Sequence, residues 1–273
     1  MKRMILIALL ICICGQVFAQ SVIYVSAGGN DDNNGQTEAT AYKSLDMAAI
    51  MAALTGAKII VIGTLTTANA TLYERGNSII FKLVSMDDQE LIITGKPGAT
   101  GSDRAVLSGR GADAKVGCIV GTAKDSNIRF ENIEISGLTD ETTAGIYVDD
   151  GGSVTLGPGA VVRGNGGFGI TVINGTCVIN GGEVRDSGRT GIVVSDKGAL
   201  TMRSGAVSGN KLSGVFVFEG GRFTMSGGTI TGNSNPKAGG GVIVDSGGRF
   251  DQTGGTVSGN TAPLFPNIFK VNG

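Results

Sequence analysis

The stretch GIVVSDKGALTMRSGAVSGN, from Gly191 to Asn210, decides the fold because close copies of it precede and follow it in the chain. Each copy opens with a glycine and continues with alternating aliphatic residues. The opening glycines are Gly145, Gly169, Gly191, Gly214 and Gly241. Their spacing indicates an internal repeat of about 23 residues, and a period in this range is typical of solenoid proteins.

Each repeat contains three short runs of alternating apolar residues, separated by glycine, aspartate or asparagine. Alternation with a period of two is typical of half-buried strands, and the separating residues form turns. Three short strands cannot bury their apolar side alone, whereas stacked repeats bury it against one another. The sequence therefore predicts an all-β fold, a parallel β-helix with three strands per coil.

The alternation also predicts which side chains point inward. Three stacked columns of apolar residues are expected, one for each strand of the coil. They comprise Ile146/Val148, Ile170/Val172, Ile192/Val194, Val215/Val217 and Val242/Val244; then Val154, Cys177, Leu200, Phe223 and Phe250; then Val162, Val184, Val207, Ile230 and Val257. Cys118 lies more than two repeats before Cys177, beyond the reach of a disulfide. Two buried free thiols are expected.

The first residues read as an export signal. Lys2 and Arg3 precede the apolar run Met4–Cys14, which is too short to span a bilayer comfortably, and Val17–Ala19 offers a cleavage site. We expect a signal peptide over residues 1–19 and an exported protein. A lipid anchor on Cys12 or Cys14 is the less favoured alternative. No other apolar run is long enough for a transmembrane segment in the mature chain.

Residues 20–273 are expected to form a single β-helix domain. Within it we distinguish an N-terminal segment with a capping helix (20–57), irregular coils (58–138), regular repeats (139–262) and a C-terminal cap (263–273). The helix is predicted from Ser44, as its N-cap, to Gly56. Its apolar stripe of Met47, Ile50, Met51 and Leu54 suits a lid over the first coil.

Three stretches resemble a known family. Residues 23–49 (IYVSAGGNDDNNGQTEATAYKSLDMAA) are similar to the N-terminal segment of many bacterial right-handed parallel β-helix proteins of the pectin-lyase-like superfamily. DSNIRFENIEISG (125–137) is similar to their coils, and GGTITGN (227–233) and GGTVSGNTA (254–262) resemble repeats of surface and autotransporter-type β-helix proteins. The resemblance implies a right-handed β-helix from a bacterium; with the export signal, the expected location is extracellular, at the outer surface or in the periplasm. It implies no single activity, because the superfamily includes lyases, hydrolases and adhesins.

Candidate ligand contacts lie at outward positions of the first strand of each repeat. Those positions hold an apolar stripe, and four of its residues are predicted to contact a ligand: Tyr147, Ile173, Phe216 and Phe218. An exposed apolar stripe of this kind often marks an interaction surface. Two other interpretations remain open, namely an aromatic ladder that stiffens the sheet and a surface covered by a loop.

Oxygen-bearing residues follow the same strands, at Asp150, Asn174, Asp196, Glu219 and Ser246, with Asp149 and Asp245 beside them. Carboxylates stacked in this way could hold Ca²⁺, and the candidate ligands are Asp149, Asp150 and Asp196. The simpler interpretation is that these residues form the turns. No other cofactor is expected. The asparagine column at Asn165, Asn210, Asn233 and Asn260 is expected to be structural.

The composition limits the function. The chain has no histidine, a net charge of −1 and no basic cluster, so a nucleic-acid partner is not expected. The first expectation is a non-catalytic module for surface binding or adhesion, with a polysaccharide or a surface protein as partner. One alternative is a Ca²⁺-dependent polysaccharide lyase acting on acidic polysaccharide, for which Arg163, Arg185 or Arg203 would be the base. Another is a structural envelope component.

Overall fold

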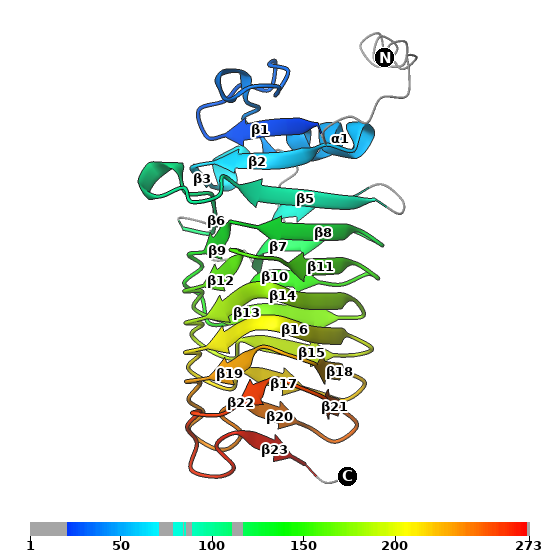
Figure 1. Cartoon of the computed structure of the whole chain (residues 1–273), viewed down its shortest axis with the longest axis vertical. Coiled ribbons are helices and arrows are strands. Elements are labelled where there is room, and N and C mark those ends of the chain that lie inside the picture. The colour runs from blue at the N-terminus through cyan, green and yellow to red at the C-terminus, as the bar shows by residue number, and fades with distance from the viewer. Residues whose placement is uncertain (1–20, 71–78, 84, 86–88, 111–116, 272–273) are drawn as a thin grey trace.

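The computed structural model describes residues 21–70, 79–83, 85, 89–110 and 117–271 of the chain. These residues form a parallel β-solenoid, in which strands of successive coils stack along one long axis (Figure 1). The expected signal peptide, residues 1–19, lies outside the described residues. No helix in the described part of the chain is long and apolar enough to cross a membrane.

The solenoid has three strand-bearing surfaces, which we call face 1, face 2 and face 3. Face 1 is an 8-stranded parallel sheet that includes the five strands that contain the opening glycines or directly follow them. Its strands are β4 (Ile79–Leu83), β7 (Cys118–Thr122), β10 (Ala144–Val148), β13 (Phe168–Ile173), β15 (Ile192–Ser195), β17 (Val215–Val217), β20 (Val242–Val244) and β23 (Ile268–Lys270).

Faces 2 and 3 together form a 15-stranded sheet. Face 2 contains β1 (Val22–Ser26), β2 (Lys58–Ile62), β5 (Glu90–Gly95), β8 (Asn127–Glu131), β11 (Ser153–Leu156), the first parts of β14 (Thr176–Arg185) and β16 (Ala199–Ser208), β18 (Arg222–Met225) and β21 (Arg249–Gln252). Face 3 contains β3 (Thr64–Leu65), β6 (Val106–Ser108), β9 (Glu134–Ser136), β12 (Val161–Arg163), the second parts of β14 and β16, β19 (Thr229–Thr231) and β22 (Thr256–Val257). β14 and β16 bend between the two faces at Gly181 (φ 101°) and Gly205 (φ 99°).

The predicted columns are confirmed by the register of the strands. Val154, Cys177, Leu200 and Phe223 pair in sequence from coil to coil, and all are buried. The rung length averages about 26 residues rather than 23. The shorter value fits the regular coils, where Val154 pairs with Cys177. It is too short for the first half of the chain, where Leu91 pairs with Ile128 and more residues separate the two paired positions.

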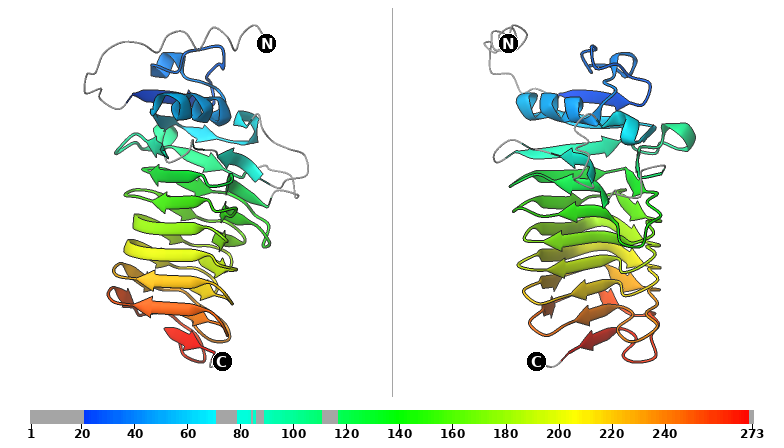
Figure 2. Two further views of the ribbon diagram at one scale, coloured as in Figure 1. Left: turned by 90° about the vertical axis from the view of Figure 1, so that its right-hand side faces the viewer. Right: turned by 180° about the vertical axis from the view of Figure 1, so that it is seen from behind.

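The N-terminal end of the solenoid is capped by α1 (Leu45–Thr55), as predicted (Figure 2). The predicted packing of this helix is confirmed only for Met51, which is partly buried against the core. Met47, Ile50 and Leu54 are 37%, 51% and 50% exposed, and the buried residues of the helix are Leu45, Asp46, Ala48, Ala49 and Ala52. Because the helix is apolar almost all round, periodicity alone does not select its buried side, and alanines allow the closest approach to β1 and β2.

The predicted N-cap bond of Ser44 is also absent, since its side chain makes no capping hydrogen bond. Asp31, which lies in the loop Gly28–Gly35 (GGNDDNNG), provides part of this capping instead. Its carboxylate accepts hydrogen bonds from the backbone N–H groups of Lys43 (2.9 Å) and Ser44 (2.8 Å). The loop therefore fixes the chain at the point where it enters the helix. Short 3₁₀ helices, η1 (Glu38–Thr40), η2 (Thr67–Asn69) and η3 (Gly101–Asp103), lie in other connections.

Cys118 and Cys177 are free and buried, as predicted. Burial raises the pKa of each thiol to about 12, so the reactive thiolate is scarce at neutral pH. We expect neither thiol to react with a disulfide reagent at pH 8 in the folded protein, and both to react once the chain is unfolded in denaturant. Counting the released chromophore in the two states is the measurement. Rapid labelling of the folded protein at either position would contradict the dry core.

Candidate functional site

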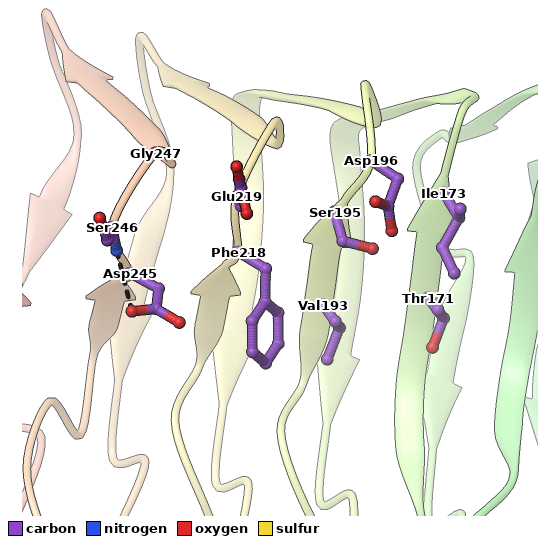
Figure 3. A pocket seen from close by; sticks show the side chains of 10 residues that line it. All are labelled: Thr171, Ile173, Val193, Ser195, Asp196, Phe218, Glu219, Asp245, Ser246 and Gly247. Carbon is purple, nitrogen blue, oxygen red and sulfur yellow. Dashed lines mark hydrogen bonds between the residues drawn. The ribbon is translucent and has the colours of Figure 1, made fainter.

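The candidate site is a hollow of about 590 Å³ on the outer surface of face 1, where strands of four successive coils end. It is lined by Thr171, Ile173, Val193, Ser195, Asp196, Phe218, Glu219, Asp245, Ser246 and Gly247. Figure 3 shows these residues in rows: Thr171 and Ile173 come from β13, Val193 and Ser195 from β15, and most of the others from the turns that directly follow β15, β17 and β20. The hollow runs along the solenoid axis, across the strands.

The hollow exists because small side chains stand beside large ones at matching outward positions. Thr171 pairs in register with Val193, and Val193 pairs with Phe216. Phe216 lies on β17 and Phe218 directly follows that strand, and their rings stack with centroids 3.9 Å apart. The paired rings stand above the sheet, whereas valine and serine at 193 and 195 leave space beside them. Phe218 therefore forms one apolar wall of the hollow.

Carboxylates line the edge of the hollow where the strands turn toward face 2. Asp196, Glu219 and Asp245 come from three successive coils, and no lysine or arginine is among the described residues that line the hollow. None of the three forms an ion pair within the described part of the chain. The hollow therefore has a floor of apolar and small hydroxyl side chains and an edge of carboxylates without ion pairs in the described residues.

Backbone hydrogen bonds hold this edge in position. The N–H of Asn174 donates to the carbonyl of Asp196, and the N–H of Asp196 donates to the carbonyl of Glu219, each at 3.1 Å. Asn174 and Asp196 have φ values of 49° and 46°, in the left-handed region that Asn and Asp tolerate best among residues with a side chain. The interpretation that these oxygen-bearing residues form turns thus accounts for their left-handed backbone conformation.

The structure brings together two of the four predicted ligand contacts, because Ile173 and Phe218 both line the hollow. Phe216 stacks on Phe218 and does not line the hollow. Tyr147 pairs in register with Thr171, one coil beyond the hollow. Partial burial and the neighbouring Asp149 raise the pKa of its phenol. Tyr147 therefore extends the outward stripe without being part of the hollow.

The stripe ends at Ile243, which is only 8% exposed although its register points it outward. Its side chain lies against Gly239, in the loop that lengthens this repeat, and next to Phe269 of the following strand. The interpretation of a face covered by a loop is thus correct for this coil. The stacked pair Phe216 and Phe218 likewise fits the interpretation of an aromatic ladder.

The three predicted metal ligands lie in two different turns. The carboxylate of Asp149 accepts a hydrogen bond from the backbone N–H of Asp150 at 2.7 Å, and Asp150 has a φ of 57°, as expected of turn residues. Asp196 lines the hollow and the other two do not. The described residues contain no group of three or more Asp, Glu, Cys or His side chains close enough to hold a metal ion.

Sequence reasoning missed Ser195, whose small side chain helps to open the hollow. The signal was available in the alternation, since Ser195 occupies the same outward position as Ile173 and pairs with it in register. Asp245 and Glu219 were noted as members of the oxygen-bearing series, for turns or for Ca²⁺, and not as part of a binding hollow. Their contribution depends on the hollow beside them, which no pattern within a single repeat reveals.

The arginines considered as bases lie elsewhere. Arg163 on face 3 forms an ion pair with the buried carboxylate of Glu134 at 2.9 Å, and Arg104 binds the same carboxylate at 2.8 Å. Arg185 pairs with Glu183 and Asp186. These two candidate bases therefore lie on a different face from the hollow and are held by carboxylates.

The fold and the regular coils define a class of protein. Residues 118–262 match the family model described as "Right handed beta helix region". The chain belongs to this right-handed β-helix family. The match covers the regular repeats and every residue that lines the hollow. No curated protein and no solved structure matches the chain.

Proposed function

We propose that this protein is an exported, non-catalytic binding module that attaches to a glycan or a surface protein through the hollow on face 1. The observation that carries the proposal is the set of outward side chains Ile173, Val193 and Phe218. They line an open hollow although the inward residues of the same strands already fill the core. Apolar groups kept at the surface beside polar ones are typical of ligand contacts.

The charge of the hollow favours a class of ligand. Asp196, Glu219 and Asp245 would repel the carboxylates of an acidic polysaccharide, because no basic side chain among the lining residues offsets them. Carboxylates accept hydrogen bonds from sugar hydroxyl groups and attract ammonium groups. A neutral or amine-bearing glycan, or a neutral to basic segment of a surface protein, therefore suits the hollow better than a polyuronate.

Filling the hollow should remove binding without harming the fold. We expect Ser195→Trp to weaken binding at least ~10-fold, which corresponds to ~1.4 kcal/mol, because the indole occupies the space next to Phe218. The measurement is affinity electrophoresis against neutral glucans, chitosan and polygalacturonate, with immobilised host-cell surface proteins as a further arm. The matched control is Thr201→Trp, an outward, half-buried position on face 2.

Three outcomes distinguish the functions. Binding to a neutral or basic target that Ser195→Trp abolishes and Thr201→Trp preserves supports the proposal. Equal loss in both variants, or binding only to polygalacturonate, contradicts it. A rise in absorbance from unsaturated uronate products would instead identify a polysaccharide lyase. Neither binding nor turnover would favour a structural envelope component.

A further inference from the structure

The hollow on face 1 runs across the strands, so its lining is supplied coil by coil. Its residues come from four successive coils, those that contain β13, β15, β17 and β20. Because parallel strands lie about 4.8 Å apart, four coils span about 14 Å along the solenoid axis. The volume of about 590 Å³ is in the usual range for small-molecule sites, about 300–1,000 Å³. A short length of a linear polymer fits this shape better than one compact molecule does.

Phe218 offers a flat apolar surface inside the hollow. One side of its ring is stacked on Phe216, with centroids 3.9 Å apart and an interplanar angle of 12°. Since Phe218 lines the hollow and Phe216 does not, the other side of the Phe218 ring is the one that a ligand can reach. The C–H groups on one side of a sugar ring pack well on such a surface, because the face of an aromatic ring carries partial negative charge.

Two carboxylates flank Phe218 along the solenoid axis. Asp196 belongs to the coil before Phe218 and Asp245 to the coil after it (Figure 3). They are therefore two coil spacings apart, about 10 Å. Neither forms an ion pair within the described residues, and Lys197, which follows Asp196 in the chain, is not part of the lining. Glu219 lies between them, in the coil of Phe218.

We propose that the hollow binds a linear chain of β-1,4-linked amino sugars that runs along the solenoid axis. The inference rests on the proposed function and names its ligand. Each sugar of an extended chain of this kind advances by nearly one coil spacing. The central sugar packs on Phe218, and its two neighbours lie over the coils of Asp196 and Asp245, whose carboxylates bind their ammonium groups.

The repeat of such a chain matches the spacing of the two aspartates. Successive sugars in an extended β-1,4-linked chain are rotated by about half a turn, so amino groups return to the same side at every second sugar. This repeat is close to the two coil spacings between Asp196 and Asp245. Glu219, one coil from each, then faces the central sugar and accepts a hydrogen bond from one of its hydroxyl groups.

The same spacing disfavours a basic peptide as the ligand. An extended peptide advances about 3.3 Å per residue, so two coil spacings correspond to about three residues. Side chains three positions apart point to opposite sides of an extended strand, so two lysines at this distance would not both reach the carboxylates. A lysine side chain also loses rotamer freedom on binding, whereas an amine attached directly to a sugar ring has little to lose.

Isothermal titration calorimetry at about pH 6, where amines are charged and carboxylates are ionised, tests the ligand. The probes are β-1,4-linked glucosamine oligomers of one to six sugars and their N-acetylated counterparts. Affinity for the amine series should rise up to about four sugars, one for each coil of the hollow, and change little beyond that length. The amine tetramer should bind ~10-fold more tightly than the N-acetylated one, because acetylation removes two ammonium–carboxylate pairs worth up to about fivefold each.

The variant Asp196→Asn/Asp245→Asn should lose most of this preference and keep its affinity for the N-acetylated tetramer. The matched control is Asp149→Asn/Asp150→Asn, in a turn of the same column two coils before Asp196 and outside the hollow. Asp149 and Asp245 each accept a hydrogen bond from the next backbone N–H, at 2.7 and 2.8 Å. Asp150 and Asp196 share a left-handed φ, 57° and 46°, which asparagine tolerates. Both variants remove two negative charges, and only the control should keep the preference.

Phe218→Leu should weaken binding of both tetramers by the same factor, since it removes the flat ring and no charge. Equal affinity for the amine and N-acetylated tetramers, loss of the preference in the control, or tighter binding of a lysine-rich peptide of the same charge would overturn the inference. Circular dichroism establishes that each variant is folded.

Failure of this inference is distinguishable from failure of the proposed function. If a neutral glucan or a surface protein binds, and Ser195→Trp blocks it, while the amino-sugar chain does not bind, the proposed function stands and the inference fails. If no ligand binds the hollow, both fail.

Discussion

Replacing Asn233 with alanine is expected to lower the free energy of unfolding by about 3 to 6 kcal/mol, one of the largest effects available in this chain. Asn233 is fully buried. Its amide donates to Asn260 Oδ1 (2.8 Å) and to the carbonyl of Val207 (3.1 Å). Its Oδ1 accepts from the backbone N–H (3.1 Å) and the side-chain amide (2.8 Å) of Asn210.

The size of this effect follows from what the substitution leaves behind. Two donors of Asn210 and the carbonyl of Val207 lose a partner in a buried place, and each unpaired buried group costs about 1 to 3 kcal/mol. Asn180→Ala is the control, since that side chain is half-buried and has one side-chain bond, to Ser204 at 3.3 Å. It should cost ~1 kcal/mol or less.

Urea unfolding followed by circular dichroism measures both variants. Similar midpoints for Asn233→Ala and Asn180→Ala would show that the asparagine column adds little to stability. The column already has one interruption, at Ser187, whose backbone N–H still donates to Asn210 Oδ1 at 3.0 Å. The coil keeps its place there because the backbone bond remains.

The repeat predicts most of the fold, because its geometry is local and periodic. The opening glycine, the alternation and the asparagine recur at fixed spacing, so matching positions such as Val154 and Cys177 become neighbours in successive coils. The buried side of α1 was not predictable in this way. Its sequence offers an apolar residue on every side, and the choice of the alanine side depends on how closely β1 and β2 approach the helix.

The candidate site was predictable only in part. Alternation correctly places Ile173 and Phe218 outside the core, and it gives Ser195 the same direction. The hollow depends on differences in side-chain volume between coils, and its limit depends on the loop at Gly239 that covers Ile243. Both are departures from the repeat. The repeat pattern cannot predict the hollow or its limit, because both depend on residues that differ from coil to coil.

Replacing Gly214 with alanine should lower the free energy of unfolding by about 3 kcal/mol, because the added methyl group overpacks its surroundings. An added Cβ would lie 2.7 Å from Ile230 Cγ2, 2.8 Å from Asn233 Nδ2 and 2.9 Å from the carbonyl oxygen of Gly241. Two of these neighbours are a packed core side chain and backbone of the next coil. The opening glycine is therefore required by close packing against the asparagine column.

The same close contact recurs at other coils, so the prediction also applies to the other opening glycines. An added Cβ at Gly145, Gly191 or Gly241 would lie 2.6 to 2.8 Å from the amide nitrogen of Asn165, Asn210 or Asn260. Gly164→Ala is the control, because a Cβ there meets nothing within 4 Å although φ is 60°. It should cost only ~1 kcal/mol, from backbone strain.

A double variant separates packing from backbone strain. In Gly214→Ala/Asn233→Ala the amide that meets the new Cβ is gone, so part of the clash is relieved. We expect the double variant to lose at least ~1 kcal/mol less free energy of unfolding than the sum of the losses of the two single variants. Strict additivity would mean that contact with the Asn233 amide adds nothing to the cost of the alanine, which would then come from Ile230 and the Gly241 carbonyl. Equal urea midpoints for Gly214→Ala and Gly164→Ala would contradict the packing argument altogether, and the glycine that opens each coil would then need another explanation.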